Sequence, residues 1–193
     1  MAKTERAAYG AGRDLLIEAA VRVVARKGLR GLTYRAVGEE AGLNNTLVAH
    51  HFGSRDALLA AALDGITHDA IESTRLLLFS TSEEDFIDAL LETTRSSPEL
   101  HAFQYEMILE ARRNPAFRPA VEKLYLDYIQ AMKEGLQAFG ITDNLDSIAR
   151  VTFASLDGLV MQYIAGVDER SIRSAIREVW NELSALAGQP VRH

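Results

Sequence analysis

The sequence predicts an all-α protein with about nine helices, three in a small N-terminal domain and the rest in a larger C-terminal domain. Apolar residues recur at helical three- and four-residue spacings through most of the 193 residues. Glycine, proline and capping residues divide this pattern into segments of helix length. No segment alternates in the way a half-buried strand does, and the composition, 48% apolar and 25% charged, is that of a folded globular chain.

The N-terminal domain begins with a helix predicted over residues 13–27, after an irregular segment at residues 1–12. Two short helices follow it. Thr33 can cap the first of them, Gly42 can end it in a left-handed conformation, and Asn44 can cap the second two residues later. Two helices joined by so tight a turn form a helix-turn-helix, whose second helix lies in a DNA major groove.

The second helix of this pair is expected to leave Asn45, Thr46, Ala49 and His50 facing outward. Asparagine can pair with an adenine edge, and threonine or alanine can contact a thymine methyl group. Residues near the starts of the flanking helices are placed for phosphates, because helix N-termini carry free N–H groups. The predicted DNA-binding residues are Thr33, Tyr34, Arg35, Asn44, Asn45, Thr46, Ala49, His50, Ser54 and Arg55.

Six further helices are expected in the C-terminal domain. The first starts after Ser54 and is about 35 Å long, which suits a rod that joins two domains. We therefore expect a DNA-binding domain at residues 1–55 and a larger second domain at residues 56–193. The expected helices run from Ser54 to about residue 78, from Glu83 to before Pro98, between Pro98 and Asn114, from Pro119 to near Gly140, and over roughly 146–166 and 169–187.

The last helix has apolar residues spaced four, three and four apart, as in a heptad seam, and the helix before it carries small residues. A seam at the end of a chain has to be buried. One alternative is packing inside its own subunit, and the other, which we favour, is a four-helix bundle with a second copy. The predicted dimer-interface residues are Val151, Ser155, Gly158, Ile172, Ile176, Val179 and Leu183.

Charge is divided unevenly along the chain. Residues 1–55 hold nine Lys or Arg and five acids, a net charge of +4, whereas the whole chain carries −6. A basic N-terminal part fits contact with a polyanion. Cysteine is absent, which excludes disulfides and thiolate metal sites. With neither a secretory signal nor an apolar stretch of about 20 residues, we expect a cytoplasmic protein with no membrane partner.

The stretch from Leu32 to Leu59, LTYRAVGEEAGLNNTLVAHHFGSRDALL, resembles the DNA-binding domain of the TetR family of repressors. In that family a helix closing in a His-Phe pair precedes Ser-Lys-Glu and a leucine. The corresponding residues here are His51, Phe52, Ser54, Arg55, Asp56 and Leu58. The helix order and the tract DGLVMQYIAG are also similar to the family. Leu47 and Ala49 depart from it, since many members have Thr and Tyr there for phosphate contacts.

The resemblance implies a homodimeric transcriptional regulator that binds a palindromic operator and is released, as a repressor, by a small molecule. It implies that residues 56–193 form the regulatory domain, which binds the ligand and the second copy. In the family the C-terminal helices enclose the ligand cavity, and we expect an apolar or mixed-polarity effector with no cofactor. The residues expected to line this cavity are Phe79, Phe103, Gln104, Met107, Tyr125, Tyr128, Asp157 and Met161.

No catalytic constellation is found in the sequence, and no metal-ligand set. His50 and His51 are adjacent on a helix and point about 100° apart, so they cannot share one ion. Gly-rich phosphate loops and nucleophile elbows are also absent. We expect a protein that is not an enzyme. Two alternatives stay open: an all-α enzyme with its substrate in the C-terminal cavity, and a regulator controlled by a protein partner.

Overall fold

The computed structural model describes residues 2–78 and 82–188, with side chains from residue 11 onward except those of residues 69, 70 and 72–78. Within these ranges the chain forms nine α-helices, two short 3₁₀ segments and no strand, which confirms the predicted fold class. The elements are α1 (Ala2–Lys27), η1 (Leu29–Gly31), α2 (Tyr34–Ala41), α3 (Asn45–Phe52), α4 (Arg55–Leu78), α5 (Glu83–Ser96), α6 (Pro98–Arg113), η2 (Pro115–Phe117), α7 (Arg118–Phe139), α8 (Leu145–Ile164) and α9 (Glu169–Leu186).

The chain forms two compact units. Unit 1 contains Met1–His68 and Glu99–Leu124, and unit 2 contains Asp69–Pro98 and Tyr125–His193. Unit 1 is therefore larger than the predicted DNA-binding domain of residues 1–55, because nearly all of α6 and the start of α7 group with the N-terminal helices. The boundary at residue 55 stays a prediction about function.

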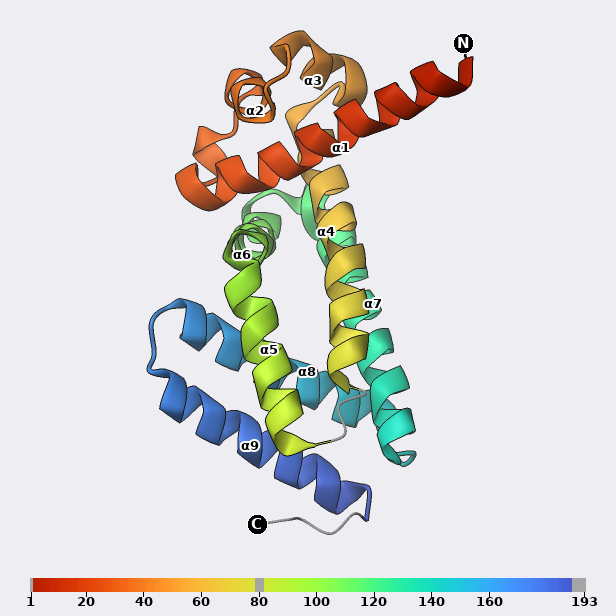
Figure 1. The fold of residues 1–193 in the computed structure, drawn as a ribbon, viewed down its shortest axis with the longest axis vertical. Helices are drawn as coiled ribbons and strands as arrows, with labels where there is room; N and C mark the ends of the chain where they lie inside the picture. The colour runs from red at the N-terminus through yellow and green to blue at the C-terminus, as the bar shows by residue number, and fades with distance from the viewer. Residues whose placement is uncertain (1, 79–81, 189–193) are drawn as a thin grey trace. The chain divides into compact units, whose positions relative to one another are not determined.

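In unit 1, α2 and α3 lie on one side of α1 (Figure 1). The apolar face of α1 is fully buried at Leu16, Ala20 and Val24, as are Val37 of α2 and Val48 of α3. The expectation that residues 1–12 are irregular is wrong, since α1 begins at Ala2. This segment is rich in alanine, which has the highest helix propensity, a factor that apolar periodicity does not measure.

The predicted caps of the two short helices are confirmed. Thr33 Oγ1 accepts a hydrogen bond from Ala36 N at 3.1 Å, and Asn44 Oδ1 accepts one from Thr46 N at 2.9 Å. Gly42 ends α2 with φ 66°, in the left-handed region where a side chain is strained. These local bonds fix where α3 begins after α2.

A second glycine, Gly38, lies inside α2 at its closest approach to the start of α3. Leu43 N donates to Gly38 O at 2.9 Å. A Cβ atom on Gly38 would lie 2.9 Å from Leu43 O and 3.0 Å from both Asn45 N and Asn45 Cα. Because these neighbours are backbone atoms, they cannot rotate away, and only glycine fits at this corner.

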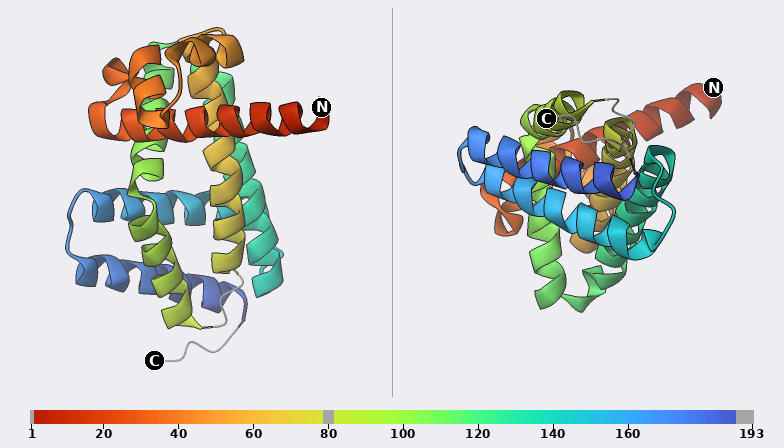
Figure 2. Two further views of the ribbon diagram at one scale, coloured as in Figure 1. Left: turned by 45° about the horizontal axis from the view of Figure 1, so that its top comes forward. Right: turned by 90° about the horizontal axis from the view of Figure 1, so that it is seen from below.

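In unit 2, α8 and α9 run antiparallel and side by side (Figures 1 and 2), and α9 also packs on α5. The rings of Phe86 on α5 and Trp180 on α9 have centroids 5.3 Å apart. Two arginines of α9, Arg173 and Arg177, form ion pairs with acids in the first turns of α5. Those acids are Glu83, Glu84 and Asp88.

We predict that Gly38→Ala destabilises the protein by about 1–3 kcal/mol, because an added methyl group must push apart two backbone segments. The matched control is Gly65→Ala on α4, where the nearest atom to a new Cβ is Ile17 Cγ2 at 3.6 Å, an ordinary contact. Gly65→Ala should be neutral or stabilising by about 0.5–1 kcal/mol. Urea unfolding of the full chain measures both, and equal effects of the two substitutions would contradict the close approach at Gly38.

Candidate functional site

The recognition face is the solvent-exposed side of α3. The four side chains predicted to read bases, Asn45, Thr46, Ala49 and His50, are all exposed. On the opposite side of the helix Val48 is completely buried and anchors α3 in the core of unit 1. An exposed polar face on a rigidly anchored helix is the arrangement that direct reading of a major groove requires.

The polar side chains around this face mostly form hydrogen bonds with nearby backbone groups. Asn44 Oδ1 accepts from both the N–H and the hydroxyl of Thr46, each at 2.9 Å. The Tyr34 hydroxyl donates to Gly53 O at 3.2 Å, which connects the start of α2 to the turn after α3. Ser54 Oγ caps α4 through Ala57 N at 3.0 Å.

The two arginines predicted to contact phosphates differ in their surroundings. Arg35 is exposed and donates to Glu39 Oε1 at 2.7 Å, and this hydrogen bond raises the pKa of Arg35. Arg55 is half-buried and turned toward the backbone of unit 1. Its Nη2 donates to Leu29 O at 2.5 Å, and its Nε donates to Leu32 O at 3.4 Å. Arg55 therefore ties the start of α4 to the η1 turn.

Residues outside the predicted set hold the helix-turn-helix on α1. Arg22 Nε donates to Glu40 Oε1 at 2.9 Å, and Arg26 binds the other oxygen of the same carboxylate. The hydrogen bond from Arg22 is the main cause of the lowered pKa of Glu40. Arg13 of α1 lies over the ring of Phe52, 5.3 Å from its centroid. The i, i+4 spacing of Arg22 and Arg26 is visible in the sequence, but their partner on α2 is not.

His51 belongs to the interior side of α3. Burial is the largest cause of its lowered pKa, and the positive charges of His50 and Arg13 lower it further. The neutral form of His51 is thus favoured at neutral pH. Of the two adjacent histidines, His50 is the exposed one.

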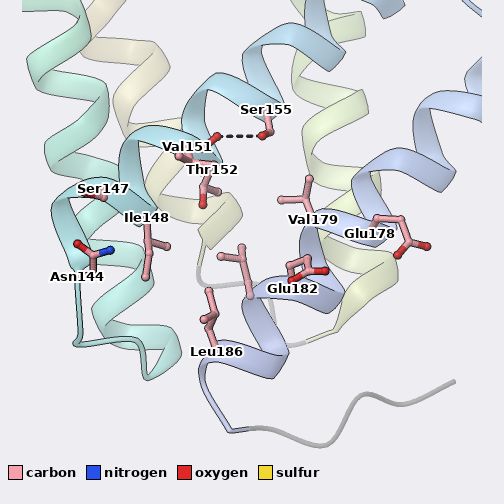
Figure 3. Close-up of a pocket in the computed structure, with 11 residues that line it drawn as sticks. Asn144, Ser147, Ile148, Val151, Thr152, Ser155, Glu178, Val179, Glu182 and Leu186 are labelled. Atoms are coloured by element: carbon pink, nitrogen blue, oxygen red, sulfur yellow. Dashed lines mark hydrogen bonds between the residues drawn. The ribbon is translucent and has the colours of Figure 1, made fainter.

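An apolar groove lies between α8 and α9 in unit 2, with a volume of about 450 Å³ (Figure 3). Val151 of α8 and Leu186 of α9 line it and are 66% and 57% exposed. Val179 also lines it and is half-buried. The full lining is Asn144, Ser147, Ile148, Val151, Thr152, Ser155, Glu178, Val179, Glu182, Leu183 and Leu186.

The burial of three residues on α9 revises part of the predicted dimer interface. Ile172, Ile176 and Leu183 are 2%, 0% and 5% exposed within the single chain, so they belong to its own core. The heptad pattern of α9 therefore packs largely inside the subunit, which was the alternative to the bundle. Among the other predicted interface residues, Val151 and Ser155 are exposed, while Gly158 and Val179 are half-buried.

The residues predicted to line a ligand cavity fall in both units. Phe103, Gln104 and Met107 of α6 are buried in unit 1, whereas Met161 of α8 is 48% exposed. Phe79 lies outside the described residues. In unit 2 the buried Tyr128, the half-buried Tyr125 and the half-buried Asp157 come together around one further aromatic residue.

That residue, Phe153, is the centre of an aromatic cluster in unit 2. Tyr128 stacks on it with ring centroids 4.9 Å apart, and Tyr125 meets it edge to face at 6.0 Å. Asp157 follows Phe153 by one helical turn. Burial and the charge of Asp157 raise the pKa of Tyr125. The cluster thus combines three aromatic rings with a nearby carboxylate, and its central member is not among the residues predicted to line the cavity.

Among residues whose side chains are described, no three His, Asp or Glu side chains lie close enough to hold a metal ion. None of the described helices combines the length and the apolar character that crossing a membrane requires.

Two family models match successive parts of the chain. Residues 16–62 match the family described as bacterial regulatory proteins, tetR family, and residues 81–182 match the tetracyclin repressor-like C-terminal domain. The second match covers more than half of the chain and includes α8 and most of α9.

Individual relatives are similar at lower identity. The HTH-type transcriptional regulator BetI of Rhizobium meliloti (strain 1021) is 26% identical over 162 residues, 78% of this chain and 76% of the relative. The HTH-type nicotine-responsive transcriptional repressor HdnoR of Paenarthrobacter nicotinovorans is 26% identical over 162 residues, 79% and 84% of the two chains. A transcriptional regulator from Saccharomonospora viridis, solved in complex with choline, has the same fold with a TM-score of 0.66 at 20% identity, covering 89% and 96%. The matches to both family domains show that the chain belongs to the TetR family of transcriptional regulators.

Proposed function

We propose that this protein is a homodimeric repressor that binds a palindromic operator and is released from it by a small organic cation. The observation that carries the DNA-binding part is the exposed face of α3, anchored by Val48 and fixed by the caps of the turn before it. The relatives are regulators, which favours this role over an enzyme. As a protein that acts on the chromosome, it is expected to work in the cytoplasm.

Asn45, Thr46, Ala49 and His50 are proposed to contact base edges, because they are exposed together on the outer side of α3. Phosphates are proposed to bind at the helix starts near Thr33, Tyr34 and Arg35 and near Ser54 and Arg55. The free N–H groups and positive charge at those ends suit an anion. Arg35, which is exposed, is better placed for this than Arg55, whose donors bind backbone carbonyls.

Dimerisation is proposed to occur through the outer faces of α8 and α9. Supporting features are the exposed apolar side chains Val151 and Leu186 and the apolar groove that they line together with Val179. An exposed apolar patch with a polar rim is typical of an interface. A second copy related by a two-fold axis would present the same patch and cover this one.

The effector is proposed to bind at the aromatic cluster of Tyr125, Tyr128 and Phe153, with Asp157 as its counter-charge. Aromatic faces and a carboxylate together attract organic cations, and burial strengthens the attraction. Choline, bound in the solved regulator from Saccharomonospora viridis, is a quaternary ammonium ion. Nicotine, for which HdnoR is named, carries a protonated amine near neutral pH.

Release from DNA is expected to follow from the spacing of the two recognition helices in the dimer. They have to be about 34–36 Å apart, or a multiple of this, to enter successive major grooves on one face of DNA. An effector that binds better to another spacing weakens operator binding. The helix α4 contributes residues to both units and is the proposed connection between effector and DNA.

We predict that Asn45→Ala, Thr46→Ala and His50→Ala each change the preferred operator sequence. Each loss of a base contact should cost on the order of 1–3 kcal/mol at its own base pair and little elsewhere. Selection of bound sequences from random duplex DNA measures the preference, with Gln137→Ala, an exposed residue of α7, as the control. An unchanged preference in all three variants would mean that this face of α3 does not read bases.

We predict that Val151→Glu and Leu186→Glu give monomers, because a two-fold axis buries each new carboxylate twice without a partner. Both positions are exposed in the single chain, so folding should survive. The matched control is Leu126→Glu on α7, which is 56% exposed but does not line the groove. Sedimentation velocity should find monomers for the first two variants and dimers for the control. Dimers in all three would move the interface away from α8 and α9.

We predict that the protein binds choline and that Asp157→Asn weakens this binding about tenfold, because the variant removes the counter-charge. The control ligand is 3,3-dimethylbutan-1-ol, an uncharged molecule of the same shape, whose affinity the substitution should leave unchanged. Calorimetric titration measures both ligands. Equal loss for the two would show that Asp157 acts only through packing.

Choline and operator DNA should each lower the protein's affinity for the other by the same factor. This factor commonly corresponds to a coupling free energy of about 1–3 kcal/mol. Titration of the ligand with and without operator measures this reciprocity. Equal choline affinity in both titrations would rule out release by this ligand even if it binds.

A further inference from the structure

Unit 1 contains a polar cleft of about 570 Å³ that shares only Arg55 with the residues proposed to contact DNA. The end of α1, the η1 turn, the first residue of α4 and one face of α6 form its walls. Neither α2 nor α3 contributes to it. The lining residues are Lys27, Gly28, Leu29, Arg30, Arg55, Glu106, Glu110 and Arg113.

The charge of this cleft is opposite to that of the chain. It has four cationic side chains and two carboxylates, a local excess of two positive charges in a protein whose net charge is −6. One of the carboxylates, Glu110, lies 3.6 Å from Arg113 Nη1, which offsets its charge. The charge of Arg55 is partly offset by Asp56, whose Oδ1 lies 3.8 Å from Arg55 Nη1. The remaining positive field comes mainly from Lys27 and Arg30, and it favours an anion.

The cleft is also partly preorganised. Arg55 is held by its bonds to the carbonyls of Leu29 and Leu32, so its guanidinium has a fixed position on the cleft wall. The side chain is nevertheless 39% exposed, which leaves part of it open to a bound group. A guanidinium that is already ordered loses little entropy when it binds an anion.

We propose that this cleft binds a small polyanion with two or more negative charges, carried by phosphate or carboxylate groups. The volume lies within the range of about 300–1,000 Å³ that small-molecule sites occupy. Arg30 and Lys27 bind the charged groups, and Arg55 orients them. The site is separate from the aromatic cluster, and its occupant is therefore a second ligand of the protein.

The test is calorimetric titration of the full-length protein with pyrophosphate and, in a second arm, with citrate, at constant ionic strength. The two arms distinguish a phosphate site from a carboxylate site. We expect saturable binding of one probe per chain. Arg30→Gln should weaken it about fivefold and Glu106→Gln should strengthen it by a similar factor, as one unit charge near a protein surface does.

The matched control is Arg112→Gln, which removes a charge from the neighbouring position of α6 that does not line the cleft. It should leave the affinity unchanged. Absence of saturable binding in both arms would overturn the proposal, as would an equal loss in Arg30→Gln and Arg112→Gln. Glu106→Gln guards against misfolding as an explanation, because a variant that gains affinity must be folded.

A backbone phosphate of DNA is the other anion to be considered. If operator DNA displaces pyrophosphate competitively and Arg30→Gln weakens operator binding equally for all sequences, the cleft is part of the DNA interface and the proposal is wrong. The calorimetric arms need no DNA, so failure of the repressor function would leave their result intact.

Discussion

The position of the recognition helix depends on one close contact between backbones, that of α2 with the start of α3. Gly38 permits this contact because a Cβ atom there would be 2.9 Å from Leu43 O. Gly42 then reverses the chain with a left-handed φ, and Asn44 caps the next helix. Since all three constraints lie within seven residues, α3 leaves α2 in one defined direction. The direction of α3 in turn determines where its exposed face points.

Contacts with α1 hold this corner in unit 1. Arg22 and Arg26 share the carboxylate of Glu40, and Arg13 lies over Phe52 at the end of α3. The lowered pKa of Glu40 means that its ion pairs stabilise the folded state at neutral pH. That contribution is lost as the pH falls through the lowered value, because protonation removes the charge. Exposed pairs contribute little energy individually, and their main effect is to orient α2 on α1.

The helices α8 and α9 have two kinds of apolar face, one that packs within the subunit and one that is exposed. The inner face of α9 packs within the subunit through Ile172 and Ile176, and the Arg173 and Arg177 ion pairs secure it to α5. The outer faces expose Val151 and Leu186 around an apolar groove. The apolar inner face of α9 belongs to the core of the subunit, and the apolar outer face is consistent with the proposed bundle.

The sequence by itself determined the boundaries of the two short helices α2 and α3, through the caps at Thr33 and Asn44 and the reversal at Gly42, because each of these depends on neighbours within four residues. It also identified the family, since the motif of the helix-turn-helix is local. Only the tertiary structure decided which apolar residues of α9 are buried, because heptad spacing gives a stripe but not the partner that covers it. The same holds for Arg55, whose bonds to Leu29 and Leu32 span more than twenty residues of chain. Phe153, the cleft on α6 and the Arg22–Glu40 pair likewise arise from residues far apart in sequence, whose meeting no local pattern encodes.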